Sequence, residues 1–123
     1  MRPREKRARV SLSCEVTGER GRTVAQVRDL SPGGCRLHAS HRHEAQELIV
    51  VAMRTPSSEL VEFAAEVRWS ADGPSPDVYG IGCRFIHSPR SRRLVEAILA
   101  EVASDPRPPG LPARTPALGP LGP

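Results

Sequence analysis

The 123-residue chain is long enough for one domain, and its composition, 38% hydrophobic and 26% charged, is typical of a soluble globular protein. No stretch approaches the roughly 20 apolar residues of a membrane-spanning helix, and no apolar run follows the charged N-terminus, so we expect a cytoplasmic protein without a signal peptide or membrane partner. The net charge of +4 lies in residues 1–9, which carry five basic groups and one acidic group, because the other 13 basic and 13 acidic groups cancel.

The first half of the chain predicts four strands. Residues 10–16 alternate between apolar and polar without a break, which is the pattern of a strand with one buried face. Residues 23–28 predict a second short strand, and residues 35–40 alternate again. The continuous apolar run at residues 48–53 is too short for a typical helix and favours a buried strand.

Two further strands follow. Residues 61–69 form the longest alternating segment, and we expect its apolar positions, which end at Trp69, to face the core. Residues 79–85 resume the alternation with Gly80 and Gly82 between the apolar positions. Glycines at this spacing in a strand allow a close backbone approach or a sharp bend.

The end of the chain predicts one helix and a tail. Ser88 and Pro89 are typical of an N-cap and a first helical residue, and the apolar positions that follow recur at helical spacing as far as Val102. Residues 104–123 contain seven prolines and three glycines in twenty positions, without periodicity. This composition predicts a disordered tail.

Six antiparallel strands and a helix fit a small closed barrel, because closure leaves no bare strand edge. We therefore predict an all-β fold, a six-stranded antiparallel β-barrel with one C-terminal α-helix. The expected organisation is a basic arm at residues 1–9, the barrel with its helix at 10–103, and the tail at 104–123. Aromatic residues make up only 3% of the chain, so the core is mainly aliphatic, with Met53 and Trp69 among its large side chains.

Cysteine and histidine spacing predicts no disulfide and no metal site. The chain has three cysteines, Cys14, Cys35 and Cys83. They are odd in number, far apart and without a Cys-x-x-Cys pair, so we expect three reduced thiols in the core. Three clustered histidines, His38, His41 and His43, lack further ligands at a recognised spacing. We interpret them as surface loop histidines.

The segment Asp29-Leu-Ser-Pro-Gly-Gly34 carries the strongest functional signal, since it lies between two predicted strands. The Asp29 carboxylate can accept from guanine N–H groups or hold an arginine, and Ser31 adds a hydroxyl. Gly34 can take a backbone conformation that other residues resist, and it lets a ligand come close. An ordinary turn, in which Asp and Ser bond to nearby backbone and the glycines supply positive φ, is the alternative interpretation.

With the arginines before the first strand, this Asp-x-Ser-x-x-Gly spacing resembles the PilZ family of cyclic di-GMP receptors. Residues 67–69, Val-Arg-Trp, and residues 79–85, Tyr-Gly-Ile-Gly-Cys-Arg-Phe, are similar to the fifth and sixth strands of that family. The resemblance covers about residues 2–102. It implies the barrel-and-helix architecture and cyclic di-GMP as the ligand, gripped by an Arg-x-x-x-Arg element and by the Asp-x-Ser-x-x-Gly turn.

The resemblance carries six candidate ligand-binding residues onto this chain: Arg4, Arg7, Arg9, Asp29, Ser31 and Gly34. Arg9 matches the second arginine of the Arg-x-x-x-Arg element, but Glu5 stands where the first is expected. Arg4 occupies the place of an extra arginine that family members often carry, and Arg7 lies inside the element, so either can substitute. Glu5 would repel phosphate unless it turned to solvent.

Two functions remain open. In the first, the domain binds cyclic di-GMP and signals to a downstream protein through ordering of its arginine-rich arm. In the second, it is a degenerate PilZ-like barrel that does not bind the nucleotide and acts as a protein-protein interaction module. General nucleic-acid binding is disfavoured, because the few aromatic residues fall on apolar phases and leave no stacking surface. No nucleophile elbow and no phosphate-loop lysine are present, so we expect neither an enzyme nor a cofactor.

Overall fold

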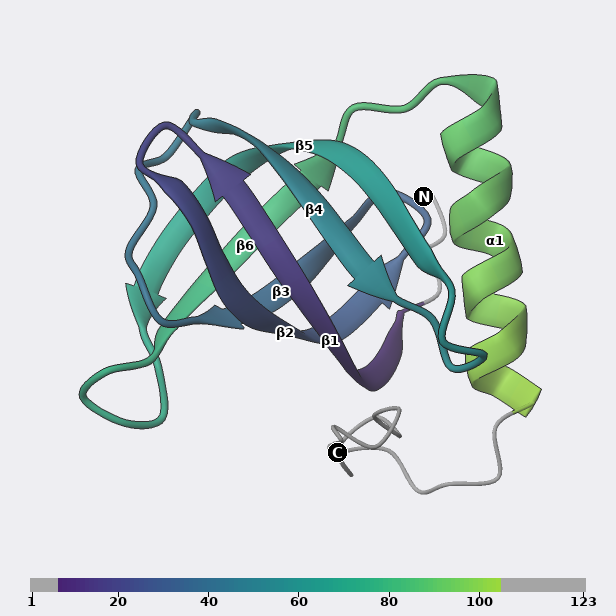
Figure 1. Ribbon diagram of the computed structural model, residues 1–123, viewed down its shortest axis with the longest axis horizontal. Coiled ribbons are helices and arrows are strands. Elements are labelled where there is room, and N and C mark those ends of the chain that lie inside the picture. Colours follow the sequence, from purple (N-terminus) through teal and green to yellow (C-terminus); the bar gives the residue numbers. More distant parts are fainter. Residues whose placement is uncertain (1–6, 105–123) are drawn as a thin grey trace, which may run out of the picture.

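The computed structural model describes residues 7–104, which form six strands and one helix (Figure 1). The elements are β1 Ala8–Gly18, β2 Gly21–Ser31, β3 Gly34–Ala39, β4 Leu48–Arg54, β5 Leu60–Asp72, β6 Tyr79–Phe85 and α1 Pro89–Ser104. The strands close into an antiparallel barrel in the order β1-β2-β3-β6-β5-β4, which confirms the predicted fold class. Most of the predicted arm and nearly all of the predicted tail lie outside the described residues.

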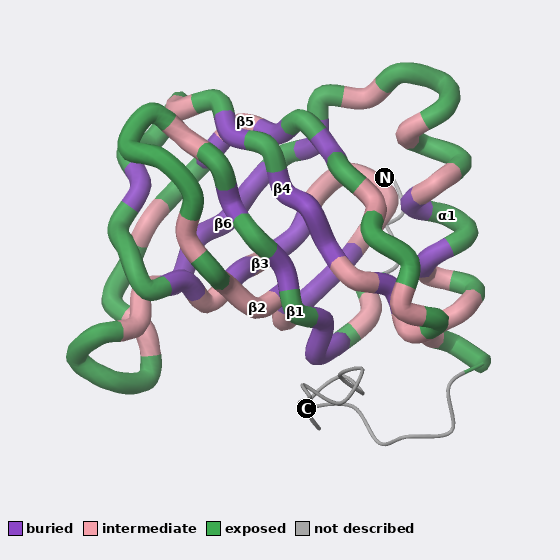
Figure 2. The backbone as a smooth tube through the Cα atoms, viewed as in Figure 1, coloured by how far each residue is buried: buried purple, intermediate pink, exposed green. Residues whose placement is uncertain are grey.

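The alternating segments do bury one face each. The inward positions of all six strands form one core, and the tube in Figure 2 changes repeatedly between buried and exposed along each strand. The α1 helix packs across one end of the barrel through Val95 and Ile98, which are both buried. Burial of such aliphatic side chains is the main favourable term in folding. Within the described residues no helix is long and apolar enough to span a bilayer.

The second strand is longer than predicted, and this changes the place of Asp29. The sequence put Asp29 in a turn, but β2 continues through Asp29 to Ser31. Ser31 pairs with Gly34, so the hairpin turn between β2 and β3 consists of Pro32 and Gly33 alone. Asp29 is therefore held by a strand on each side rather than by a loop.

Strand pairing is irregular at three places: between Arg9 and Leu12 of β1, and at two places that redirect side chains of the site. The β2–β3 register shifts between Val27 and Asp29, and the β5–β6 register shifts between Val67 and Trp69, which leaves Arg68 as an extra residue. A bulge of this kind reverses the alternation beyond it. The prediction that Trp69 lies in the core is wrong for this reason, because 45% of the residue is exposed on the outer face.

The three cysteines are free and buried, as the sequence predicted. Cys35 and Cys83 are direct neighbours across β3 and β6. A hydrogen bond with Cys83 and burial raise the pKa of Cys35 well above its ordinary value. Burial also raises the pKa of Cys14 to about 12. The thiols of Cys14 and Cys35 therefore stay protonated in the folded protein at neutral pH.

The histidines differ from the prediction of three surface loop residues. His38 lies within β3, and His41 is exposed after it. His43 is only 7% exposed, and its Nδ1 atom lies 3.2 Å from a carboxylate oxygen of Glu47. This contact helps to fix the segment between β3 and β4. Within the part of the chain that the structure describes, no three potential metal ligands gather together.

Candidate ligand-binding site

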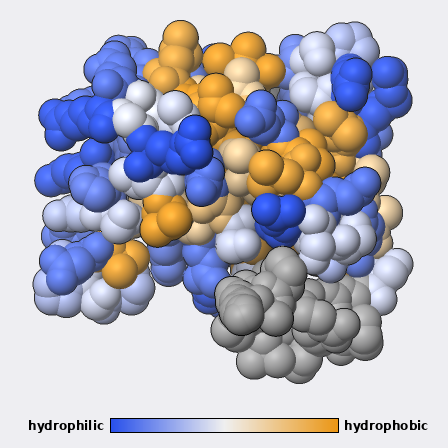
Figure 3. Space-filling view, in the orientation of Figure 1, coloured by the Kyte–Doolittle hydropathy of each residue, from blue (hydrophilic) through white to orange (hydrophobic). Residues whose placement is uncertain are grey.

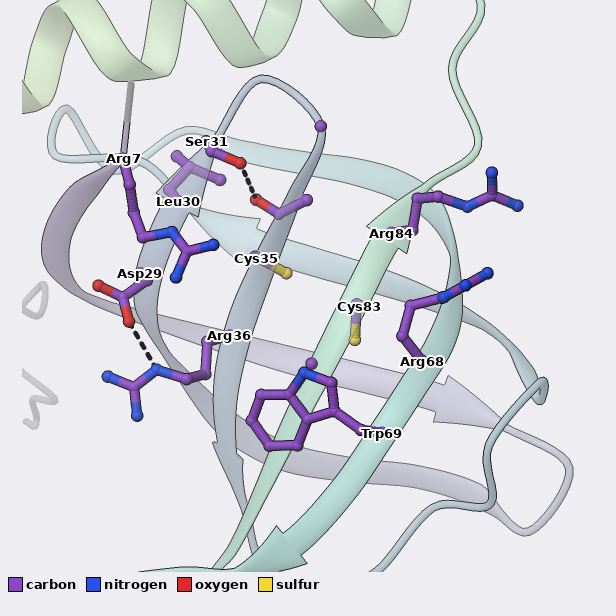
Figure 4. Close-up of a pocket in the computed structure, with 13 residues that line it drawn as sticks. Arg7, Asp29, Leu30, Ser31, Cys35, Arg36, Arg68, Trp69, Cys83 and Arg84 are labelled. Carbon is purple, nitrogen blue, oxygen red and sulfur yellow. Dashed lines mark hydrogen bonds and ion pairs between the residues drawn. The ribbon is translucent and has the colours of Figure 1, made fainter. Parts of the chain in front are cut away.

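A pocket of about 360 Å³ lies against the wall that β3 and β6 form, between side chains from β2 and β5 (Figure 4). Four arginines from separate segments face it: Arg7, Arg36, Arg68 and Arg84. Asp29 and Trp69 supply the carboxylate and the aromatic surface. The predominance of guanidinium groups makes the pocket suited to an anionic ligand with planar, polar edges.

Asp29 holds one of these arginines in place. Its Oδ2 atom lies 2.5 Å from the Nε atom of Arg36, and only 12% of the Asp29 side chain is exposed. The bulge before Asp29 puts the two residues directly opposite each other on β2 and β3. Of the two roles that the sequence suggested for the carboxylate, the structure shows the positioning of an arginine, and Arg36 had not been singled out.

Ser31 and Gly34 close the hairpin beside this ion pair. The Ser31 hydroxyl donates to the Gly34 carbonyl oxygen at 3.3 Å. A Cβ atom on Gly34 would lie 2.1 Å from the Cys83 carbonyl oxygen, so β3 approaches β6 too closely for a side chain here. The expected positive φ is not found, since within residues 7–104 Gly21 is the glycine with that conformation. Close strand packing, rather than backbone freedom, explains why Gly34 is a glycine.

Trp69 lies flat against β6, seated on its glycines (Figure 4). A Cβ atom on Gly82 would come within 2.1 Å of the Trp69 Nε1 atom, and one on Gly80 would lie 3.6 Å from the ring. The absence of a side chain on Gly82 thus makes room for the indole. The dismissal of an exposed stacking aromatic on sequence grounds was therefore wrong for Trp69.

Two arginines of the pocket share one carboxylate. Arg84 Nη2 lies 3.0 Å from Glu66 Oε1, and Arg68 Nη1 lies 3.4 Å from the same atom. The hydrogen bond from Arg84, with a smaller contribution from Arg68, holds the pKa of Glu66 below its ordinary value. The carboxylate is therefore charged at neutral pH, and both arginine side chains remain more than half exposed, at 62% and 57%.

Comparison with known proteins gives a family. The sequence matches the PilZ domain family over residues 1–101. The chain belongs to the PilZ domain family. No curated protein matches it, but this PilZ domain has the fold of several solved structures.

Three of these structures, from three organisms, illustrate the similarity in fold. The PilZ domain with c-di-GMP of YcgR from Escherichia coli has a TM-score of 0.69 at 15% identity, over 85% of this chain and 94% of that one. The Bacillus subtilis inhibitor of motility MotI/DgrA has a TM-score of 0.67 at 15% identity, and the match covers 87% of this chain and 54% of that one. The K. pneumonia MrkH-c-di-GMP complex has a TM-score of 0.65 at 20% identity, and the match covers 85% of this chain and 53% of that one. The chain thus spans about half the length of the last two.

Four of the six predicted site residues line the pocket of this PilZ domain: Arg7, Asp29, Ser31 and Gly34. Arg9 lies opposite Asp29 in the strand register of β1 and β2, but it does not line the pocket. Arg4 and Glu5 lie outside the described residues.

Sequence reasoning missed the four other charged or aromatic lining residues: Arg36, Arg68, Trp69 and Arg84. Gly80 and Gly82 were the available signal for Trp69, because glycines in one strand leave room for a large side chain of the adjacent strand.

Proposed function

We propose that this PilZ domain is a non-catalytic receptor that binds cyclic di-GMP in the pocket between Trp69 and the Asp29–Arg36 pair. The observation that carries the proposal is the position of the Trp69 indole, which packs on Gly82 and lies in the pocket with arginines on both sides. An exposed indole offers a stacking surface for a purine, an interaction worth about 1–3 kcal/mol per base. The c-di-GMP complexes of YcgR and MrkH, which share this fold, support the same ligand class.

The guanidinium groups suit the two other parts of such a ligand. An arginine can donate two parallel hydrogen bonds to guanine O6 and N7, or to two phosphate oxygens. Arg36 is oriented for this task by Asp29, at 2.5 Å. Arg7 enters the pocket from the residue before β1. In the proposal Arg4 and Arg9 join Arg7, and the ligand orders the arm against the barrel.

A calorimetric titration with cyclic di-GMP tests the proposal. We expect saturable binding. At a ligand concentration about 100 times the Kd, the free energy of unfolding should increase by about 2.7 kcal/mol. GTP and cyclic di-AMP serve as controls and should not reproduce it. The single tryptophan of the chain lies in the pocket, so its fluorescence provides a second readout. A flat titration with unchanged fluorescence would contradict the proposal.

Two substitutions assign the roles within the site. Asp29→Ala should weaken binding, because Arg36 loses its only carboxylate partner among residues 7–104. Arg9→Ala should abolish binding if Arg9 closes over the ligand together with the arm, whereas unchanged binding would leave that role to Arg7. Arg22→Ala is the matched control, since Arg22 is exposed, paired with Glu15 and outside the pocket.

Glu5 favours the interaction-module alternative, and a second surface offers a place for a partner. An apolar groove on the outer face of β4 and β5 is lined by Leu48, Val50 and Ile86, which are 65%, 40% and 48% exposed. Figure 3 shows apolar residues gathered over these strands. Such a patch is a typical docking surface for a protein partner. It is compatible with either function, because a receptor can use the same groove to contact a downstream protein.

A further inference from the structure

The wall of the pocket opposite Arg7 carries positive charge that the Arg-x-x-x-Arg comparison does not account for. Arg68 and Arg84 line the pocket from β5 and β6 (Figure 4). Within the described residues their side chains contact a single carboxylate, that of Glu66, so two guanidinium groups share one negative charge. Arg36, by contrast, has Asp29 to itself.

We propose that Arg68 and Arg84 form a second anion subsite, which binds a phosphate of the cyclic dinucleotide and which Glu66 occupies while the ligand is absent. The inference rests on the proposed function and deepens it. It assigns to the barrel wall a share of the phosphate binding that the arm, with Glu5 in place of an arginine, lacks.

The strand geometry places this subsite beside the stacking surface. Arg68 is the extra residue of the β5 bulge and directly precedes Trp69. Arg84 lies two positions beyond Gly82, the residue on which the indole is seated. Bulges commonly redirect side chains next to binding sites. In the proposal, a base stacked on the indole directs one phosphate towards these two arginines.

Glu66 is a weak competitor for these arginines. Ion pairs of exposed side chains contribute little to stability, and both arginines are more than half exposed, at 57% and 62%, while 20% of the Glu66 side chain is exposed. Each phosphodiester of the ligand offers two non-bridging oxygens, which a guanidinium fork can bind bidentately. Exchange of the Glu66 carboxylate for a ligand phosphate is thus favourable without any backbone change.

The test compares matched pairs by calorimetry with cyclic di-GMP. The double variant Arg68→Ala, Arg84→Ala removes the subsite, and Arg22→Ala removes an arginine of similar exposure that is paired with Glu15 away from the pocket. Glu66→Gln frees the two arginines, and Glu15→Gln is its control. Thermal unfolding without ligand checks that each variant is folded.

We expect the double variant to bind at least tenfold more weakly, since a charge-assisted hydrogen bond is worth about tenfold or more in affinity. Glu66→Gln should bind up to about fivefold more tightly, which corresponds to the loss of one exposed ion pair. Both control variants should bind like the parent chain.

Parent-like binding by the folded double variant would overturn the subsite while leaving the receptor function intact. Weaker binding by Glu66→Gln would overturn its role as a competitor. No binding by the parent chain would reject the proposed function, and the subsite with it.

Discussion

The Nε2 atom of His87 lies 2.5 Å from the carbonyl oxygen of Pro32, although 55 positions separate the two residues. Its Nδ1 atom lies 2.9 Å from the hydroxyl of Ser91, in the first turn of α1. Because a carbonyl can only accept, Nε2 is the donor in the first contact. One imidazole therefore connects the hairpin turn beside the proposed site to the helix that covers the end of the barrel.

His87→Ala should loosen this connection. The lost hydrogen bond predicts a decrease of about 1 kcal/mol in the free energy of unfolding, measured by urea denaturation. Hydrogen exchange at the amides of Ser31 and Gly34 should become faster. His41→Ala, on an exposed side chain, is the control and should change stability by less than about 0.5 kcal/mol. Equal effects of the two substitutions would show that His87 does not stabilise the hairpin.

Gly82→Ala should displace the Trp69 indole, because the added Cβ would lie 2.1 Å from Nε1. We expect a changed tryptophan emission spectrum and weaker binding of cyclic di-GMP. Gly80→Ala is a close control in the same strand, since its Cβ would meet the ring at an ordinary 3.6 Å. The same fluorescence and affinity in both variants would mean that packing of the indole on Gly82 is not needed for ligand binding.

Gly34→Ala should destabilise the barrel itself. The new Cβ would lie 2.1 Å from the backbone oxygen of Cys83, and a backbone atom cannot move aside as a side chain can. Overpacking of this kind typically costs about 1–3 kcal/mol, which urea denaturation measures. A variant as stable as Gly80→Ala would contradict the close approach of β3 to β6.

Alkaline pH should destabilise the protein through its buried thiols. Burial raises the pKa of Cys14 from 9.0 to about 12, so its thiol keeps its proton in the folded state after the unfolded chain has lost it. The stabilisation is complete below pH 9 and is lost as the pH rises towards 12. The free energy of unfolding should fall by about 1.4 kcal/mol per pH unit for this group in that range. Urea denaturation of Cys14→Ala should show a shallower fall, and an unchanged slope would exclude Cys14 as a cause.

The inner face of the barrel was predictable from the sequence because it depends on local alternation. From Val10 to Val16 every second residue is apolar, and the same positions are buried in β1. The Pro32-Gly33 turn was likewise marked by its composition. Asp29, Ser31 and Gly34 could be selected because they stand close together in the chain and resemble a family motif.

The rest of the site depends on strand pairing, which local patterns do not reveal. Apolar alternation continues through Trp69 in the sequence, but the extra residue Arg68 reverses the direction of the side chains. Arg36 and Arg84 come from β3 and β6, which are far apart in the sequence and become neighbours only when the barrel forms. Such non-local contacts are set by the whole barrel.

Under the proposed receptor function, closure of the barrel limits how the domain can signal the binding of a ligand. Each strand has a hydrogen-bonded neighbour on both sides, down to the β1–β4 seam at Cys14–Thr17. Along the paired stretches a partner cannot add a strand to the sheet, and the two walls of the pocket cannot separate without breaking backbone hydrogen bonds between strands. In the receptor proposal, a signal therefore reaches another protein through side chains, through the residues before β1, through the Pro32-Gly33 turn, or through α1, to which His87 connects that turn.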